Sequence, residues 1–261
     1  MPLNDLPLPL ALTFFGVAGL IFGSFLNVVI LRLPKDQSLV RPASRCPACE
    51  SKIRFWDNIP VLSYLLLGGK CRNCRQPIGL RYPAIELATA ILFILAGWRF
   101  GVGLGGWIAA LFLAALLALA VIDLEHMILP DVITLPGVAL GVLVQPWIPN
   151  GHFAHSLIGA LAGAGALILL INTWYWIREE ESMGLGDVNM MAMLGAFLGW
   201  QNGIVALALA TASGALIGIA MMIFGRAGWK SKIPFGVFLA IGGAIALFYG
   251  PRIAAAYISL Y

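Results

Sequence analysis

Charged residues are scarce in this sequence. Only 11% of the 261 residues are Asp, Glu, Lys or Arg, whereas 61% are hydrophobic. Soluble domains carry roughly 25% charged residues, so this composition argues against an ordinary soluble protein. Three long stretches, 6–31, 100–122 and 188–225, contain no charged residue at all. Apolar runs of about 18 residues or more are typical of transmembrane helices, and they predict an all-α, polytopic membrane protein.

A positively charged amino-terminal region is also missing. The residues before the first apolar stretch include Asp5 but no Lys or Arg. A cleaved signal peptide needs such a basic region, so we expect this stretch to remain as the first span. The apolar segments together predict about eight spans, near residues 10–31, 83–98, 100–122, 131–147, 153–177, 188–200, 203–224 and 233–249.

The few basic residues are distributed unevenly between the predicted loops. Ten of the sixteen lie between Arg32 and Arg81, in the segment that separates the first two spans. With the amino terminus outside, only Arg99 and Arg252 fall outside as well, and the other fourteen are cytoplasmic, in agreement with the positive-inside rule. This bias explains the net charge of +4, so no nucleic-acid partner is expected. The chain thus divides into a first span (1–31), a cytoplasmic domain (32–82) and a multi-span domain (83–261).

Cysteines are few, and all lie in the cytoplasmic domain. They form two C-x-x-C knuckles, Cys46-Pro-Ala-Cys49 and Cys71-Arg-Asn-Cys74. Two such pairs at this separation are typical of tetrahedral zinc sites, and a segment this short needs a staple to fold. Four thiolates leave no open position, so the zinc would be structural. A redox dithiol pair and an iron–sulfur cluster are the alternatives, whereas disulfides are disfavoured in a reducing compartment.

Acidic residues are equally rare, and two of them occupy costly positions. Asp123 ends the third predicted span, and Asp187 directly precedes the sixth, both on the cytoplasmic side. The sixth span is only about 20 Å long against a hydrocarbon core of about 30 Å, which places Asp187 below the membrane surface. Gly184 and Gly186 would allow an irregular loop there, facing a wet cavity. Asp131, after Pro130, is instead expected to be an N-cap.

Two aspartates that face one water are the requirement for aspartic-protease chemistry. One carboxylate acts as a base on the water, and the other, protonated, polarises the scissile carbonyl. The same two residues would suit a proton-coupled transporter with a zinc-stapled domain, although the sequence shows no repeated half of the kind that transporters have. A membrane-anchored zinc module that only binds partners is a third hypothesis, and it leaves Asp187 without a purpose.

The motifs, read in order, resemble those of the prepilin peptidases, a G-x-G-D intramembrane aspartic protease family with N-methyltransferase activity. Besides the cysteine knuckles, the resemblance rests on Gly23-Ser-Phe-Leu-Asn-Val28, Arg32-Leu-Pro34, Arg81-Tyr-Pro83 with Glu86, the segment from Asp123 to Asp131, Gly184-Leu-Gly-Asp187 and Pro234-Phe-Gly236. It covers nearly the whole chain. Two departures are Asn189, where many members have Lys, and Val237, where Pro is common.

The resemblance implies a bacterial inner-membrane enzyme that cuts the basic leader from prepilin or pseudopilin precursors at the cytoplasmic face. Asp123 and Asp187 would be its catalytic residues. It also implies S-adenosylmethionine-dependent methylation of the new amino terminus, for which no site is predicted. The literal G-x-G-x-x-G at 101–106 follows no strand, so we reject it as a cofactor site. The acidic run 179–181 either attracts the basic leader or is simply a solvated charge run.

Overall fold

The structure is a computed structural model that describes residues 7–148, 151–179, 184–224 and 233–259. The regular elements among the described residues are all helices, and the only bridges there are two isolated antiparallel ones, Arg45 with Lys52 and Lys70 with Pro77. The chain divides into two compact units, 1–118 and 119–261. The all-α prediction is therefore confirmed.

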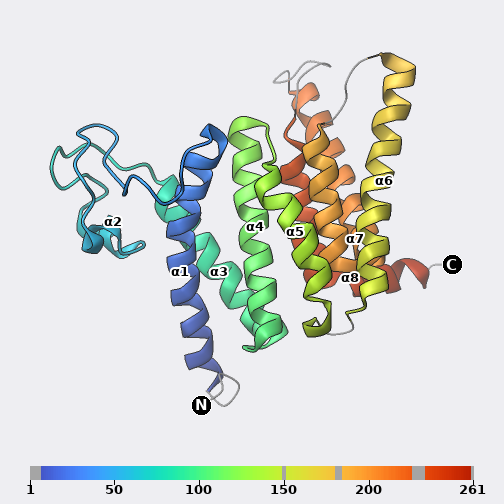
Figure 1. Ribbon diagram of the computed structural model, residues 1–261, viewed down its shortest axis with the longest axis horizontal. Helices are drawn as coiled ribbons and strands as arrows, with labels where there is room; N and C mark the ends of the chain where they lie inside the picture. Colours follow the sequence, from blue (N-terminus) through green and yellow to red (C-terminus); the bar gives the residue numbers. More distant parts are fainter. Residues whose placement is uncertain (1–6, 149–150, 180–183, 225–232, 260–261) are drawn as a thin grey trace. The chain divides into compact units, whose positions relative to one another are not determined.

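The first unit is built on two helices that cross closely. Helix α1 (Leu8–Arg32) packs along α3 (Arg81–Phe100), as Figure 1 shows. A Cβ at Gly23 would lie 2.7 Å from the Cα of Glu86, so only glycine permits this approach. Helix α4 (Leu104–His126) begins in the same unit, and its Trp107 stacks 4.4 Å from Phe15 of α1.

The segment between α1 and α3 is less polar than its cysteines and basic residues suggest. It contains the short helices η2 (Leu33–Lys35), η3 (Phe55–Asn58) and α2 (Leu62–Leu66). Phe55, Leu65 and Leu66 are exposed. Phe55 and residues 58–60 line a groove with Ile21 and Phe25 on the exposed apolar face of α1. An exposed apolar surface that continues the face of a membrane span belongs at the lipid interface.

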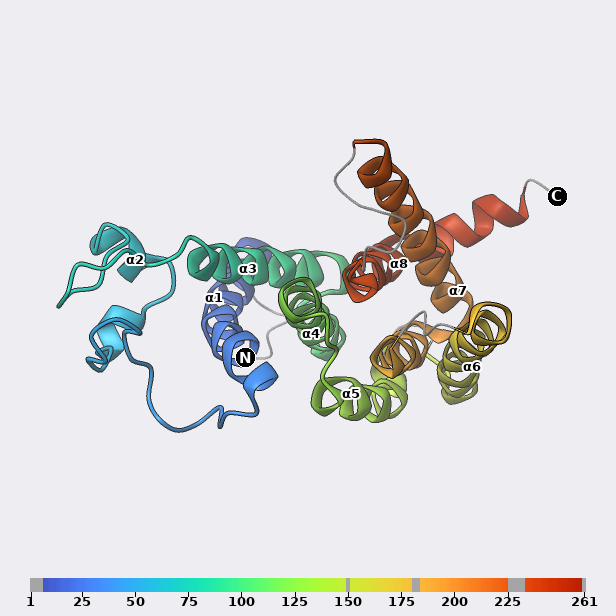
Figure 2. The same ribbon diagram turned by 90° about the horizontal axis from the view of Figure 1, so that it is seen from above.

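The second unit packs three helices around α7 (Leu185–Ile223). Helices α5 (Asp131–Leu143), α6 (Phe153–Arg178) and α8 (Phe235–Ile258) all contact it, with the short η4 (Gln145–Trp147) after α5 (Figures 1 and 2). The contact between α6 and α7 is tightest at two glycines, since a Cβ at Gly159 would clash with the backbone carbonyl of Gly195. Small residues at such crossings let membrane helices approach closely.

Helix α7 is interrupted at Gly199. Its 39 residues would extend about 58 Å, nearly twice the hydrocarbon thickness, if they were straight. Gly199 has φ 74° and ψ 171°, a conformation open essentially to glycine alone. Figure 2 shows the two halves running in different directions. The two predicted spans 188–200 and 203–224 therefore correspond to the two halves of one broken helix.

Six of the described helices are long and apolar enough to cross a membrane: α1, α3, α4, α6, α7 and α8. Helix α5 is shorter, with thirteen residues, and η4 follows it and ends at Trp147, where the predicted fourth span ends. The prediction of about eight spans counted α5 and both halves of α7. The chain is thus a multi-pass membrane protein.

Candidate active site and metal centre

Asp123 is held at the carboxyl-terminal end of a buried helix. It lies in the last turn of α4, and its side chain is only 5% exposed. The Oδ2 atom accepts a hydrogen bond from the backbone N–H of Val237, 3.2 Å away, in the first turn of α8. A Cβ at Gly236 would lie 2.8 Å from the same oxygen. The start of α8 therefore orients this carboxylate, a role that the side-chain pattern of the sequence did not reveal.

Asp187 lies in the first turn of α7, after the N-cap residue Gly184. The expectation of an irregular loop at Asp187 is wrong, because this residue is already helical, and its N–H donates to the Gly184 carbonyl at 3.2 Å. The side chain is half-buried, and it lies near enough to Asp123 for negative charge on one carboxylate to disfavour charge on the other. The fold of the second unit thus brings the two predicted aspartates into one electrostatic environment.

The two glycines before Asp187 have different surroundings. A Cβ at Gly186 would lie 2.9 Å from the Cβ of Leu129 and 3.2 Å from its carbonyl oxygen. A Cβ at Gly184 would meet nothing closer than 3.9 Å among the described residues. The predicted close approach of the backbone therefore applies to Gly186, which packs α7 against the segment that follows Asp123.

Asp131 does not cap α5 in the expected way. The N-cap residue is Pro130, and no side-chain capping bond is formed. Instead Asp131 Oδ1 accepts a hydrogen bond of 2.8 Å from the side-chain amide of Asn189. This bond joins α5 to α7 two residues after Asp187. Of the acidic run 179–181, only Glu179 belongs to the described residues.

The four cysteines meet in one cluster. Their sulfur atoms all lie within 4.8 Å of one another, and Cys46 Sγ is 3.7 Å from Cys74 Sγ. Four sulfurs at about 2.3 Å from a tetrahedral zinc ion are separated by about 3.8 Å, so this donor set fits the metal. No pair forms a disulfide. Four closely placed thiols of this kind could bind a metal ion.

Each knuckle has the same backbone construction. The Cys46 N–H donates to Ser51 and the Cys71 N–H to Gln76, at 3.0 and 2.8 Å. The residue after each second cysteine, Glu50 or Arg75, has a positive φ of 54° or 60°. The repeated turn aims both thiols of each pair inward without glycine at the turn.

The sulfurs differ in proton affinity. A hydrogen bond from the Ser51 side chain lowers the pKa of Cys49 to about 6. The pKa of Cys74 is raised to about 11, because desolvation and the neighbouring sulfurs outweigh a backbone hydrogen bond with Gln76. Four adjacent thiols cannot all ionise without a cation among them, and metal binding to such sites therefore releases protons.

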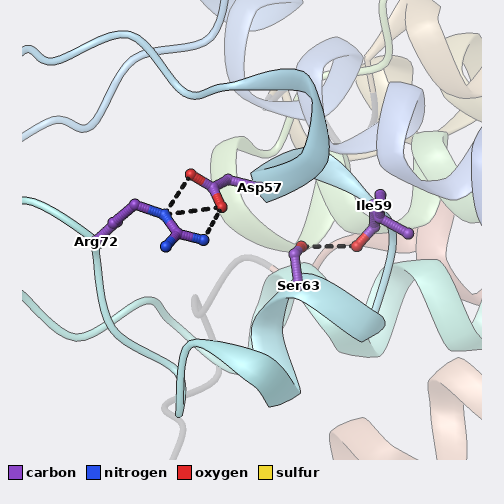
Figure 3. Close-up of polar contacts among 4 residues, drawn as sticks. All are labelled: Asp57, Ile59, Ser63 and Arg72. Atoms are coloured by element: carbon purple, nitrogen blue, oxygen red, sulfur yellow. Dashed lines mark hydrogen bonds and ion pairs between the residues drawn. The ribbon is translucent and has the colours of Figure 1, made fainter.

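Arg72, one of three arginines near the knuckles, is bound to a carboxylate. Its guanidinium contacts both oxygens of Asp57, with 2.6 Å from its terminal nitrogen to Oδ1 and 2.9 Å from Nε to Oδ2 (Figure 3). This bond lowers the pKa of the Asp57 carboxyl. The pair ties the second knuckle to η3.

Comparison with known proteins places both units in one family. Residues 17–100 match the family described as "Bacterial Peptidase A24 N-terminal domain", and residues 110–219 match "Type IV leader peptidase family". The chain is also 40% identical to a Pseudomonas aeruginosa protein named prepilin leader peptidase/N-methyltransferase, over 92% of this chain and 91% of that protein.

This chain belongs to the type IV leader peptidase family. A Burkholderia pseudomallei relative with the same name is 40% identical over 94% of this chain and 87% of its own length. A Myxococcus xanthus relative with that name is 42% identical over 86% and 67%. No solved structure matches the chain. Family membership decides between the hypotheses from the sequence, since it supports the peptidase and gives the transporter no support.

Proposed function

We propose that this leader peptidase removes the leader of prepilin-type precursors with Asp123 and Asp187 as its catalytic pair, and that it methylates the new amino terminus. The relatives carry both activities in their name. The assignment of these two residues rests on one observation, which is that two helix ends each place an aspartate in the same region of the second unit. The last turn of α4 and the first turn of α7 each supply one aspartate, and the two charges interact.

The geometry suits hydrolysis of an amide by a bound water. Two adjacent carboxylates share one proton, so one can accept a proton from water while the other donates to the scissile carbonyl. The Val237 N–H bonded to Asp123 Oδ2 keeps that oxygen in place, which leaves Oδ1 as the more available atom for water. Collapse of the tetrahedral intermediate then needs a proton on the leaving amine, and the acidic member of the pair can supply it.

The cysteine cluster is proposed to hold one structural zinc ion through Cys46, Cys49, Cys71 and Cys74. The donor chemistry and the sulfur separations support zinc, and four thiolates leave no ligand position for a substrate. We further propose that the amino terminus lies outside and the cysteine-containing segment in the cytoplasm of a bacterial inner membrane. The distribution of basic residues supports this orientation.

The catalytic assignment is tested by replacing single acids in purified, reconstituted protein. Asp123→Asn and Asp187→Asn are each expected to lower the cleavage rate of a prepilin substrate by about a thousandfold or more, because either change removes the acid/base pair. Glu125→Gln on α4 and Asp131→Asn at the start of α5 are the acidic controls, and both are expected to stay within about threefold of wild type.

The pH–rate profile gives a second readout. Wild-type cleavage is expected to be bell-shaped, with its two limbs belonging to the coupled pair. Near wild-type cleavage by either Asn variant would rule out the two-aspartate mechanism.

A further inference from the structure

A cavity of about 500 Å³ in the first unit has no part in the proposed peptide cleavage. The carboxyl-terminal half of α1, the start of α3 and both cysteine knuckles contribute to its walls. Small-molecule sites are typically about 300–1,000 Å³ and carry a few well-placed polar groups. The cavity has the size of such a site.

The cavity is lined by two buried polar side chains with unused hydrogen-bonding capacity. Asn27 is 4% exposed, and its side-chain nitrogen donates to the Tyr82 and Gly23 carbonyls at 3.1 and 3.3 Å. Its Oδ1 atom has no hydrogen-bond partner among the described residues. Such an unpartnered buried acceptor is unusual and calls for a donor from a ligand.

Glu86 provides the second polar group. It is 8% exposed and accepts a hydrogen bond of 2.7 Å from the backbone N–H of Val61 through Oε2. The Ser24 side chain provides a second hydrogen bond, but neither donor carries a charge, so a cationic ligand at this position would be favoured.

The rest of the lining has the opposite charge and some aromatic surface. Arg45, Lys52 and Arg54 line the cavity, together with the rings of Tyr64 and Tyr82. The Asp57–Arg72 pair and the 2.6 Å bond from the Ser63 hydroxyl to the Ile59 carbonyl brace one wall (Figure 3). Besides the Asp57 carboxylate that Arg72 pairs, the site therefore combines the Glu86 carboxylate, the Asn27 amide acceptor, aromatic residues and basic groups.

We propose that this cavity binds the methyl donor S-adenosylmethionine, a sulfonium nucleoside, which deepens the proposed N-methyltransferase activity and rests on it. The donor carries a positive sulfonium, for which Glu86 is the counter-charge. Its carboxylate suits the basic side chains, and its adenine N–H groups suit the free acceptor of Asn27. Aromatic rings stabilise cations and stack on bases.

The transfer itself balances without a further reactant. The amine lone pair of the new amino terminus forms the N–CH₃ bond, and the S–CH₃ bond breaks with its electron pair remaining on sulfur. The product is a neutral thioether. The ammonium must first lose a proton, and water or a carboxylate of the site receives it.

The test compares S-adenosylmethionine with S-adenosylhomocysteine, which lacks the methyl group and the sulfonium charge. Binding of each is measured by calorimetry on the purified full-length protein. Glu86→Gln is expected to weaken S-adenosylmethionine binding about tenfold or more, because it removes a buried charge partner, and to affect the thioether by less than about threefold. Asn27→Leu is expected to weaken both ligands alike.

Asp36→Asn is the matched control, since Asp36 is an exposed acid of the same unit outside the cavity. This variant should bind both ligands as wild type does.

Cleavage of a prepilin substrate is measured on every variant. Normal cleavage with lost donor binding supports this proposal, whereas normal cleavage with unchanged donor binding in both variants overturns it. The cleavage rates of the Asp123 and Asp187 variants test the peptidase assignment only. They do not test the donor-binding proposal.

Photolabelling keeps the proposal testable if a variant misfolds. Ultraviolet cross-linking of methyl-labelled S-adenosylmethionine to wild-type protein, followed by mass spectrometry, should mark peptides within residues 24–86. Labelling confined to residues 119–261, or no saturable binding by wild type, would contradict the cavity as the donor site.

Discussion

At the residue scale, the candidate active site depends on where a single Cβ atom can fit. Gly186 and Gly236 both face the side chain of Leu129, and Gly236 also faces Asp123 Oδ2. Gly184 is not confined in this way. The G-x-G-D motif therefore contains one glycine that close packing requires and one that the described surroundings do not.

This difference predicts unequal effects of two similar substitutions. Gly186→Ala places a Cβ 2.9 Å from Leu129 Cβ, so α7 must shift and Asp187 with it. We expect cleavage efficiency to fall about tenfold or more, because small displacements of a catalytic group are costly. Gly184→Ala, its control, is expected to stay within about twofold. Equal losses in kcat/KM for the two variants would contradict this account.

At the element scale, the break in α7 is built into the packing of the second unit. Gln145 Nε2 and Ser156 Oγ, both buried, donate to the Ala196 carbonyl at 2.8 and 2.6 Å. This carbonyl lies three residues before Gly199, where the regular helical hydrogen bonds are interrupted. Interrupted helices in membranes survive only where neighbouring groups satisfy the backbone, and α5–η4 and α6 provide those groups here.

The break predicts a backbone cost at Gly199. A Cβ there would find room, with its nearest neighbour 3.7 Å away, so Gly199→Ala tests conformation and not crowding. Its φ and ψ lie in a region costing other residues about 1–3 kcal/mol, and we expect the midpoint of thermal unfolding in detergent to fall accordingly. Gly165→Ala on α6 meets open space and should not lower it. An unchanged midpoint for Gly199→Ala would mean that α7 can straighten.

At the scale of the whole molecule, the two units carry different chemistry. The first contains the cysteine cluster and the cavity with Asn27 and Glu86, and the second contains both aspartates. Segment 33–80 has no long helix of its own, so its conformation depends on the knuckles, the Asp57–Arg72 pair and contacts with α1. The metal ion proposed to bind between the knuckles would be the strongest of these links.

Removal of the metal is therefore expected to unfold this segment while the helices persist. Cys46→Ser and Cys71→Ser should each reduce bound zinc from one ion per chain to a small fraction. Limited proteolysis should then cut within residues 33–80, with helical content unchanged. Ser44→Ala, a neighbouring change outside the cluster, should retain the metal. Iron with sulfide, or full protection from protease after chelation, would contradict a structural zinc site.

Much of this architecture follows from the sequence alone because its signals are local. Apolar runs longer than the hydrocarbon core require helices, since no other local structure satisfies the backbone in lipid. Two C-x-x-C turns specify a metal-binding cluster because the ligands of each pair are sequence neighbours. Asp123 and Asp187 could be singled out because charged residues are rare in this sequence, and an acidic side chain at the end of an apolar run is energetically costly.

Tertiary structure decided what depends on contacts between distant segments. The Val237 N–H on Asp123, the Asn189 amide on Asp131 and the Val61 N–H on Glu86 join residues that no sequence period relates. Backbone donors have no side-chain signature, so two of these partners cannot be read from residue types. The break at Gly199 was likewise hidden, because a glycine in an apolar run is as common in a straight membrane helix as in an interrupted one.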